Sequence, residues 1–363
     1  MSKVKLGDVA IEHKETCGGS KDGYPIVGLE HLTPEEVTLT AWDEDSDNTF
    51  TKVFRKGNVL FGRRRAYLRK AAVAPFDGIC SGDITVIEAI PDRILPELLP
   101  FIIQNDGLFS FAVGKSAGSL SPRVKWEHLK NYEFELPSMD RQCELAELLW
   151  AMDTTKKSYQ KLIAATDELV KSQFIGWSKS ISRSAYRTLD SICTLITDGT
   201  HQPPKFVSCG IPFLLVSNIT SNKVTYATDK YITEEMYLEL SKRTPVEVGD
   251  ILLSTVGSYG HPAIVKENRK FSFQRHIAFL KPDHDQVDSV YLHAAILSSD
   301  VQKQIDSLVL GVAQKTLNLS AIKKIEIPLP NMAQQKQFAG FVRQSDKSKF
   351  AIQSCSNLNL SGL

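Results

Sequence analysis

A basic segment between Arg55 and Lys70 is the most concentrated group of chemically distinctive residues in the sequence. It contains seven basic side chains, no acidic one and an interleaved Tyr67. The basic residues are Arg55, Lys56, Arg63, Arg64, Arg65, Arg69 and Lys70. Guanidinium groups donate planar pairs of hydrogen bonds that fit phosphates and guanine edges, and a Tyr ring can stack on a base or pack against a sugar. The same residues would also suit a solvated face that balances the acidic residues of 43–47, and charge alone slightly favours that interpretation.

No segment has the residue types and spacing of a recognisable catalytic or metal site. VGKSAGS (113–119) lacks the first Gly of a phosphate-binding loop, since Phe109 stands at that position. HQPPKF (201–206) has Gln202 where an amino-methyltransferase motif has Asn or Asp, and Lys205 where that motif has an aromatic residue. The eight histidines show no metal-ligand spacing, and neither a nuclease motif nor a G-x-S-x-G elbow is present. We therefore expect a non-enzymatic chain that binds no cofactor and no metal itself.

The totals describe a globular chain long enough for two domains. Of its 363 residues 42% are apolar and 23% charged, and the formal net charge is only +1. No segment approaches the roughly 20 apolar residues of a membrane span, and MSKVKLGDVA lacks the apolar core of a signal peptide. The six cysteines form no C-x-x-C pair: Cys17, Cys80, Cys143, Cys193, Cys209 and Cys355. We expect reduced thiols and a cytoplasmic protein without a membrane partner.

An internal repeat places the basic segment within the first of two similar halves. Four segments of the first half correspond in order to four of the second, at offsets that drift from 183 to 193. The pairs are KLGDVAIEH (5–13) with TLDSICTLI (188–196), YPIVGLEHL (24–32) with IPFLLVSNI (211–219), KGNVLFG (56–62) with VGDILLS (248–254), and VKWEHLKNYEFELP (124–137) with LNLSAIKKIEIPLP (317–330). Copies of about 180 residues indicate a domain duplication rather than a solenoid.

Each copy ends in Leu-Pro, a polar residue, Met and a nearby Gln, and a helical period follows. We expect a helix over about 139–175, with Ser138 as its N-cap and Gly176 as its stop. Its heptad positions include Leu145, Leu148, Met152, Tyr159, Leu162 and Leu169. The shorter second helix, 331–354, offers Phe338, Phe341 and Ile352. The heptads favour antiparallel pairing of the two helices as a spacer, over two amphipathic helices that each pack on their own domain.

The pattern predicts an α+β fold of two strand-rich, mixed α/β globules, duplicated about a pseudo-twofold axis and joined by long helices. The expected domains are a first globule over 1–137, a central helix over 138–178, a second globule over 179–330 and a C-terminal helix over 331–363. Expected strands are 58–62, 84–89, 131–136, 213–217, 250–254, 276–280 and 324–329, and expected shorter helices are 96–111 and 289–306.

Loops at matching places in the two copies differ in chemistry. The counterpart of the Arg-rich segment is STVGSYGHP (254–262), which could hydrogen-bond bases or simply form a turn. The first copy's candidate binding residues are Arg63, Arg64, Arg65, Tyr67, Arg69, Lys115, Ser119 and Arg123. Those of the second copy are Thr200, His201, Ser258, Tyr259, His261, Gln274, Arg275 and Lys315. Similar frameworks with unlike side chains suit a protein that recognises two different halves of one asymmetric target.

Several stretches carry a family resemblance: ITDGTHQPPKF with GIPFLLVSNI, VGDILLSTVGSYG, and LNLSAIKKIEIPLPNMAQQKQFAGFV, with their first-half partners. Nearly the whole chain resembles the specificity subunit of Type I restriction-modification systems. The resemblance implies two target-recognition domains that bind a split double-stranded DNA sequence, and helices that space them and dock two methyltransferase (modification) subunits. Those partners would hold S-adenosylmethionine, and a restriction/translocase subunit would use ATP and Mg²⁺. The short second helix and the low net charge depart from this picture.

Two other classes of protein remain open from the sequence. A duplicated protein–protein adaptor would share the repeat and the paired helices, and its binding would depend less steeply on salt than DNA binding does. A hydrolase with an unrecognised site would be active as the purified chain alone.

Overall fold

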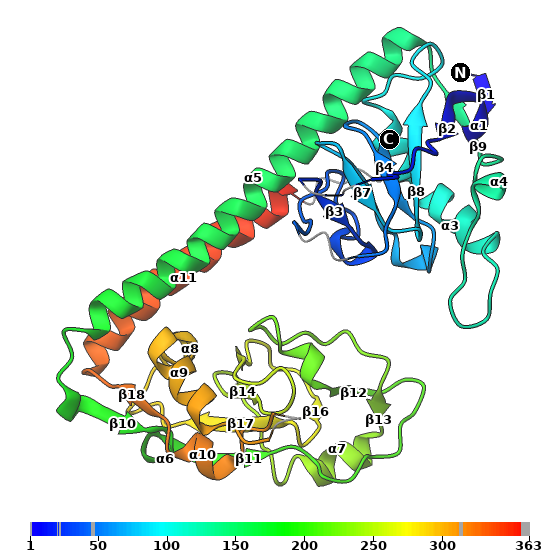
Figure 1. Cartoon of the computed structure of the whole chain (residues 1–363). Helices are drawn as coiled ribbons and strands as arrows, with labels where there is room; N and C mark the ends of the chain where they lie inside the picture. Colours follow the sequence, from blue (N-terminus) through cyan, green and yellow to red (C-terminus); the bar gives the residue numbers. More distant parts are fainter. Residues whose placement is uncertain (1, 20, 22, 45–47, 312–314, 357–363) are drawn as a thin grey trace. The chain divides into compact units, whose positions relative to one another are not determined.

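The computed structural model describes residues 2–19, 21, 23–44, 48–311 and 315–356, with side chains up to residue 351 (Figure 1). The chain divides into a first unit, Met1–Lys157, and a second unit, Ser158–Leu363, and each is described by itself. None of the helices in the described part combines the length and apolarity that crossing a bilayer requires. The boundaries expected at 137, 178 and 330 follow sequence motifs rather than packing, and they stay predictions.

The first unit is built from short strands and short helices. Its strands are β1 (Ser2–Lys5), β2 (Ala10–Glu12), β3 (Ile26–Val27), β4 (Lys52–Phe54), β5 (Val59–Gly62), β6 (Ala71–Val73), β7 (Gly78–Cys80), β8 (Ile84–Ala89) and β9 (Glu133–Leu136). Its helices are α1 (Leu6–Val9), η1 (Leu29–His31), η2 (Ala66–Leu68), α2 (Leu99–Ile103), α3 (Asp106–Gly114), α4 (Trp126–Leu129) and the start of α5 (Met139–Ser178). The strands form sheets of order β2-β8-β5-β6, β3-β7-β4 and β1-β9.

The second unit repeats this plan. Its strands are β10 (Tyr186–Thr188), β11 (Cys193–Asp198), β12 (Ile211–Leu214), β13 (Tyr231–Ile232), β14 (Ile251–Ser254), β15 (Pro262–Ile264), β16 (Ser272–Phe273), β17 (Ile277–Pro282) and β18 (Glu326–Pro328). Its helices are the end of α5, η3 (Arg183–Ala185), α6 (Leu189–Ile192), η4 (Val216–Asn218), α7 (Glu234–Leu240), α8 (Ser289–Leu297), α9 (Ser299–Leu308), α10 (Leu319–Lys323) and α11 (Met332–Ser356). Its sheets are β11-β17-β14-β15, β13-β12-β16 and β10-β18.

The two units therefore share a topology, which confirms the predicted α+β duplication. Both contain a four-stranded antiparallel sheet, and both have a parallel pair, β3 with β7 and β12 with β16. They differ in the third strand of the small sheet. In the first unit β4 pairs with β7, whereas in the second unit β13 pairs with β12.

Local capping changes the predicted helices in several places. The segment 96–111 forms two helices, because the Asn105 side chain accepts a hydrogen bond from the Gly107 N–H and starts α3 there. Ser298 likewise ends α8 and caps α9, which divides 289–306. The strand expected over 213–217 ends at Leu214, where η4 follows. Helix α5 begins at Met139 as predicted.

Helix α5 continues through Gly176 to Ser178, so the expected stop at that glycine is wrong. The aromatic rings on either side of it pack into the second unit. The Phe174 and Phe338 rings meet edge to face at 5.3 Å between centroids, and Trp177 stacks on Phe338 at 5.6 Å. This packing outweighs the low helix propensity of glycine, which costs about 1 kcal/mol relative to alanine.

The contact between α5 and α11 in the second unit uses residues of α5 other than the predicted heptad positions. On α5 it includes Val170 and Phe174, which join one apolar cluster with Phe338 and Phe341 of α11. The Lys349 ammonium also pairs with the Asp167 carboxylate at 2.7 Å.

The remaining heptad residues lie outside this contact. Leu162 and Leu169 are 50% and 47% exposed, and Leu148 in the first unit is similarly exposed. Leu145 packs on the first unit's core, and Met152 and Tyr159 are half-buried. The side chain of Ile352 lies outside the described residues.

A buried glutamine joins each globule to the helix that follows its Leu-Pro. In the first unit, the Leu95 N–H donates to Gln142 Oε1 at 2.8 Å, and Gln142 Nε2 donates to the Pro137 carbonyl at 3.0 Å. In the second unit, the Asp288 N–H donates to Gln335 Oε1 at 3.0 Å.

The second glutamine completes the same pattern 193 positions further on. Its Nε2 donates to the carbonyls of Pro330 at 2.9 Å and Gln286 at 3.0 Å. Gln142 and Gln335 are 2% and 1% exposed. The repeated Leu-Pro and Gln of the sequence are therefore a structural joint, because the glutamine satisfies backbone groups that would otherwise be buried without partners.

We expect Gln335→Ala to lower the free energy of unfolding by roughly 2–4 kcal/mol, because it removes a buried amide that satisfies three backbone groups. The neighbouring Gln334 is exposed, so Gln334→Ala is a matched control with an expected change within about 0.5 kcal/mol. Urea unfolding followed by tryptophan fluorescence measures both variants. Equal effects of the two substitutions would contradict the stabilising role of Gln335.

Candidate functional site

In the first unit, two loops far apart in the sequence are hydrogen-bonded side by side. The Arg65 N–H donates to the Pro122 carbonyl at 2.8 Å, and the Val124 N–H donates to the Arg63 carbonyl at 3.0 Å. A further backbone bridge links Arg64 with Arg123. We call residues 63–69 and 115–124 the first-unit loop pair. The structure thus brings together two segments that the sequence proposed separately.

A network of side chains connects this loop pair through Asp83, at the start of β8. Arg123 Nε and Nη2 donate to the two Asp83 carboxylate oxygens at 2.6 and 3.1 Å. Arg64 Nη1 lies 3.5 Å from the same carboxylate, and its Nε donates to Ser121 Oγ at 2.9 Å. The hydrogen bond from Arg123 holds the pKa of Asp83 below its ordinary value, and Asp83 in turn raises the pKa of Arg123.

Other basic side chains of the segment serve structural contacts. Arg55 pairs with Glu15 and Asp77. Arg69 pairs with Asp106, and Lys70 Nζ donates to a backbone carbonyl. The apparent basic run therefore separates into residues that hold the fold and residues that remain for a ligand.

The remaining predicted residues of the first unit lie at or near the surface of the loop pair. Arg65 and Tyr67 are exposed around η2, and Arg65 has a left-handed φ of 54°. Lys115 and Ser119 are exposed on the second loop, where Lys115 Nζ lies 5.7 Å from the centre of the Phe111 ring. Exposed aromatic and cationic groups side by side suit contacts with bases and phosphates.

The second unit holds the equivalent loops with the same backbone hydrogen bonds. The Gly257 N–H donates to the Lys315 carbonyl at 3.2 Å, and the Leu317 N–H donates to the Thr255 carbonyl at 2.8 Å. A backbone bridge joins Val256 to Thr316. Residues 255–261 and 315–317 form the second-unit loop pair.

The loop pairs also attach to their sheets alike. The Arg63 N–H donates to the Asp83 carbonyl at 3.0 Å, and the Thr255 N–H donates to the His276 carbonyl at the same distance. His276 therefore stands where the first unit has Asp83. Burial, with a contribution from Arg275, lowers the pKa of His276 and favours its neutral form.

The side chains on the second-unit loop pair differ from those of the first. Ser258 is exposed, and Lys315 Nζ lies 5.9 Å from the centre of the Tyr259 ring. The Tyr259 hydroxyl donates to Asp306 at 2.9 Å. His261 is held by Asn222 at 3.2 Å and is only half-exposed.

A second group of predicted residues meets beside this loop pair. Thr200 and Gln274 form a backbone bridge, and the Arg275 N–H donates to the Thr200 carbonyl at 3.0 Å. His201 Nε2 pairs with Asp198 at 2.9 Å. A pocket of about 290 Å³ opens there, lined by Asp198, Thr255, Arg275, His276 and Thr316 among others. The segments 198–201 and 274–276 thus bring hydroxyl, imidazole and guanidinium groups close to the loop pair.

Sequence reasoning missed Asp83, Ser121, Asp198 and His276. Asp83 and His276 are 193 positions apart, the same offset as that between the segments 124–137 and 317–330, and this offset was the available signal. Their partners lie too far along the chain for spacing to reveal them.

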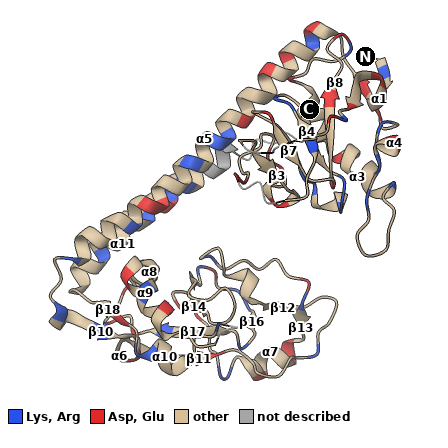
Figure 2. Ribbon diagram, in the orientation of Figure 1, with Lys and Arg blue, Asp and Glu red and all other residues tan. Residues whose placement is uncertain are grey.

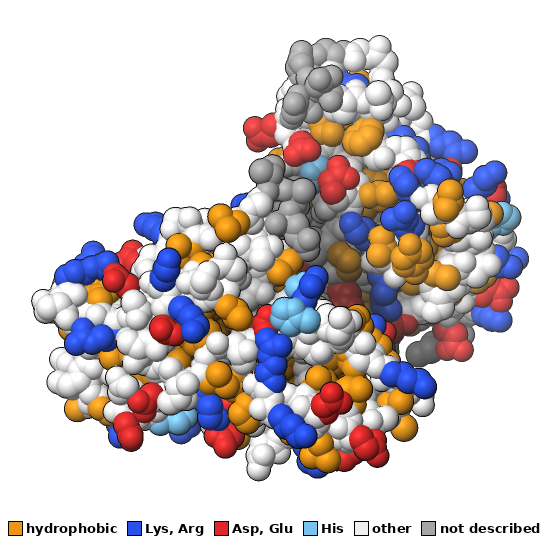
Figure 3. Space-filling view, turned by 90° about the horizontal axis from the view of Figure 1, so that it is seen from below, with side chains coloured by type: hydrophobic (Ala, Val, Ile, Leu, Met, Phe, Trp, Pro, Cys, Tyr) orange, Lys and Arg blue, Asp and Glu red, His pale blue; other side chains and the backbone are white. Residues whose placement is uncertain are grey.

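Basic and acidic residues are interspersed along α5 and α11 (Figure 2). On the face in Figure 3, Lys and Arg side chains lie next to exposed hydrophobic ones. Within the described residues, no group of three or more His, Cys, Asp or Glu side chains could hold a metal ion.

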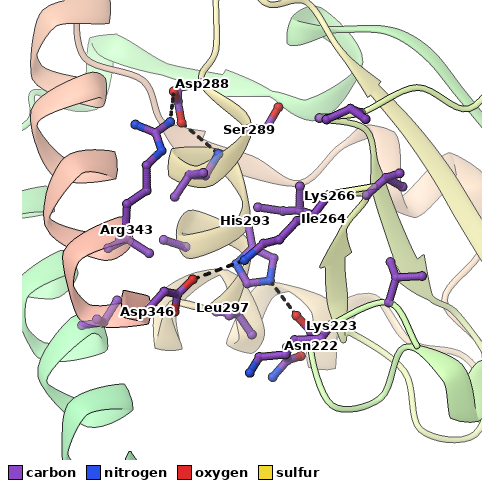
Figure 4. Close-up of a pocket in the computed structure, with 18 of the residues that line it drawn as sticks. Asn222, Lys223, Ile264, Lys266, Asp288, Ser289, His293, Leu297, Arg343 and Asp346 are labelled. Atoms are coloured by element: carbon purple, nitrogen blue, oxygen red, sulfur yellow. Dashed lines mark hydrogen bonds and ion pairs between the residues drawn. The ribbon is translucent and has the colours of Figure 1, made fainter. Parts of the chain in front are cut away.

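A larger pocket of about 890 Å³ lies in the second unit between α5, α8, α11 and β15 (Figure 4). Its charged side chains pair across it: Arg343 with Asp288 at 3.0 Å, and Lys266 with Asp346 at 3.4 Å. His293 is half-buried at its wall, where Nε2 donates to the Pro262 carbonyl at 3.1 Å. We attribute this pocket to packing between the helices and the globule.

Comparison with known proteins identifies the class of the fold. Over 98% of its length the chain is similar to a chain from a structure of complex assembly and conformational transition of the type I R-M system, with 19% identity, a TM-score of 0.52 and 92% of that chain covered. It is also similar to the Type-I restriction-modification system S subunit from M. genitalium, with 13% identity, a TM-score of 0.52, and 98% and 91% of the two chains covered. These likenesses establish the fold.

Sequence comparison finds similarity to one family of proteins. Residues 184–359 match the Type I restriction modification DNA specificity domain. The chain is 29% identical over 168 residues to the Type I restriction enzyme EcoBI specificity subunit of Escherichia coli, a match that covers 46% of this chain and 34% of that protein. A match of 21% identity to the putative type I restriction enzyme MjaX specificity subunit of Methanocaldococcus jannaschii covers 94% of this chain and 84% of that protein.

The resemblance to Type I specificity subunits that the motifs predict is thereby confirmed. The extent of the matches varies: the chain spans about a third of the EcoBI subunit's length and 60% of that of the Type I restriction enzyme MjaVIII specificity subunit of M. jannaschii.

His293 leads to a prediction about the pH dependence of stability. Burial lowers the pKa of His293 to about 4, with Lys266 lowering it further and Asp346 opposing. The unfolded chain therefore binds a proton between about pH 6.5 and pH 4 that the folded chain does not, so His293 makes stability fall as pH falls through this window. We expect wild type to lose up to about 3 kcal/mol more than His293→Gln between pH 7 and pH 4, because the variant retains every carboxylate but not this titration. Denaturant unfolding at a series of pH values measures the difference, and parallel curves would contradict it.

Proposed function

We propose that this chain recognises a split duplex DNA sequence as the specificity subunit of a Type I restriction-modification complex. The observation that carries the proposal is the loop pair that both units hold in the same backbone arrangement with different side chains. The bridged positions are Arg64 and Arg123 in the first unit, and Val256 and Thr316 in the second. The DNA specificity domain match over 184–359 favours this function over a protein adaptor or a hydrolase.

The unlike side chains define two unlike half-sites. Contacts to phosphates position a protein on DNA, whereas contacts to base edges specify the sequence. Guanidinium groups dominate the first-unit loop pair, and hydroxyl and imidazole groups dominate the second. Each unit would therefore recognise its own bases in a similar pose, so that the complete target is asymmetric.

Partner subunits would perform the chemistry. We propose that modification subunits carry S-adenosylmethionine and methylate the DNA, and that a restriction/translocase subunit uses ATP and Mg²⁺. The exposed Leu162 and Leu169 of α5 support a docking surface for an apolar helix face of a modification subunit, because they are seven residues apart and therefore lie on one side of the helix. This chain would contribute recognition and no catalysis.

Selection of bound DNA from a random duplex library tests the proposed function. The full chain, purified with its modification subunits, should select two short half-sites separated by a fixed gap. The double variant Arg65→Ala, Tyr67→Ala should lose preference in one half-site only, and His201→Ala, Ser258→Ala in the other only, by roughly tenfold at the contacted bases. Selection of no gapped motif, or equal losses in both halves for each variant, would contradict the proposal.

The docking surface gives a separate prediction. We expect Leu162→Lys combined with Leu169→Lys to abolish co-purification with the modification subunits while the free energy of unfolding changes by less than about 1 kcal/mol, since both side chains are already exposed. Ala164 is also exposed and lies about 200° around the helix from Leu162, so Ala164→Lys is the matched control. Retained assembly in the double variant would exclude this surface.

A further inference from the structure

The Asp83 carboxylate lies at the centre of the first-unit loop pair. It accepts two hydrogen bonds from Arg123 and lies 3.5 Å from Arg64, while Arg63 bonds to its backbone carbonyl. Its side chain is 21% exposed, whereas those of Arg64 and Arg123 are 39% and 41% exposed. The carboxylate is thus set back from the surface, and the two guanidinium groups extend beyond it.

The hydrogen bonds leave one edge of Arg123 available. A guanidinium has five N–H donors in a planar fork. Asp83 takes the edge formed by Nε and Nη2, so that Nη1 and the second hydrogen of Nη2 form another edge with two parallel donors. A contact of this kind fixes the plane of the guanidinium without using its recognition edge.

The local charge also favours an electron-rich partner. Arg63, Arg64 and Arg123 all act on Asp83 electrostatically, so one carboxylate faces three guanidinium groups. The pair at Arg55 is different, because Glu15 and Asp77 together outnumber its single charge. Arg55 is therefore neutralised, whereas the cluster around Asp83 keeps an excess of positive charge.

The second unit has no such arrangement at the matching positions. His276 stands in place of Asp83, and Val256 and Thr316 stand in place of the two arginines. The two units therefore differ at three positions that are equivalent in their backbone arrangement. We expect this difference in side chains to give the two units different target sequences.

We propose that Asp83 is a positioning residue that orients Arg123, with Arg64 beside it, to recognise a guanine in the half-site read by the first unit. The inference rests on the proposed function and deepens it. Guanine presents O6 and N7 as two neighbouring acceptors in the major groove, which match the two parallel donors of an oriented guanidinium edge. A phosphate could also accept both donors, but it would carry no base preference.

The test compares base preference at the first half-site between wild type and Asp83→Asn. Each protein is the full chain purified with its modification subunits, and the probes are two sets of duplexes, one in which only the first half-site is varied and one in which only the second is varied. Wild type should prefer guanine at one position by tenfold or more, and Asp83→Asn should reduce that preference by roughly tenfold at that position alone. Recognition of the second half-site should not change.

Three further variants keep the test decisive. Asp83→Glu should restore part of the preference, because it retains a carboxylate. Arg123→Lys keeps the charge but loses the two-donor edge, so it should lose guanine preference even if Asp83→Asn fails to fold. Asp77→Asn removes a carboxylate that pairs with Arg55 outside the loop pair, and it should behave as wild type.

The outcomes separate this inference from the proposed function. A wild-type complex that selects no gapped motif contradicts the proposed function itself. A gapped motif that contains no guanine in the first half-site, or an unchanged preference in both Asp83→Asn and Arg123→Lys, overturns the role of Asp83. If Asp83→Asn and Arg123→Lys weaken DNA binding equally for all bases, and the salt dependence of binding falls by about one phosphate contact, these arginines contact the DNA phosphates. That result overturns guanine recognition.

Discussion

In each unit a buried glutamine side chain bonds the backbone at the point where a strand-rich globule passes into a long helix. The Leu-Pro before each helix leaves a carbonyl that the helix itself does not use, and Gln142 or Gln335 donates to it. The same amide accepts a backbone N–H from a distant part of the globule, at Leu95 or Asp288. Because a buried backbone group without a partner is costly, this joint fixes how each globule adjoins its helix.

A second set of backbone bonds carries the functional surface. In both units, hydrogen bonds between main-chain atoms hold two loops side by side, so that side chains can change without loss of the loop geometry. This separation of framework from side chains explains how one duplicated fold can carry Arg64 and Arg123 in one copy, and Val256 and Thr316 in the other. On the proposed function, specificity would depend on a few exposed groups, while the buried sheets remain alike.

Much of this arrangement could be predicted from the sequence where the determinants are local. The period-two strands, the repeat, the start of α5 and the polar loops all depend on neighbouring residues. The sequence did not predict the break between α8 and α9 at Ser298, because the helical spacing of apolar residues continues across this cap. The continuation through Gly176 was missed because its cause is tertiary, in the aromatic contacts of Phe174 and Trp177.

The candidate site was harder to predict than the fold, because its contacts join distant residues. Asp83 is 40 positions from Arg123, and neither residue type indicates the other. Arg69 was predicted as a DNA-binding residue, and its pair with Asp106 could not be foreseen from the sequence. The heptads of α5 did not predict its contact with α11, which Val170 and Phe174 make, because the same spacing serves a contact within this chain and a surface for another one.

The central claim is that this chain chooses the DNA sequence on which a Type I complex acts. The most direct measurement is a map of methylated adenines across the genome of the native host, with the gene present and deleted. The account predicts that deletion removes methylation at one asymmetric motif with a fixed gap and nowhere else. Unchanged methylation, in cells shown to express the chain before deletion, would contradict it.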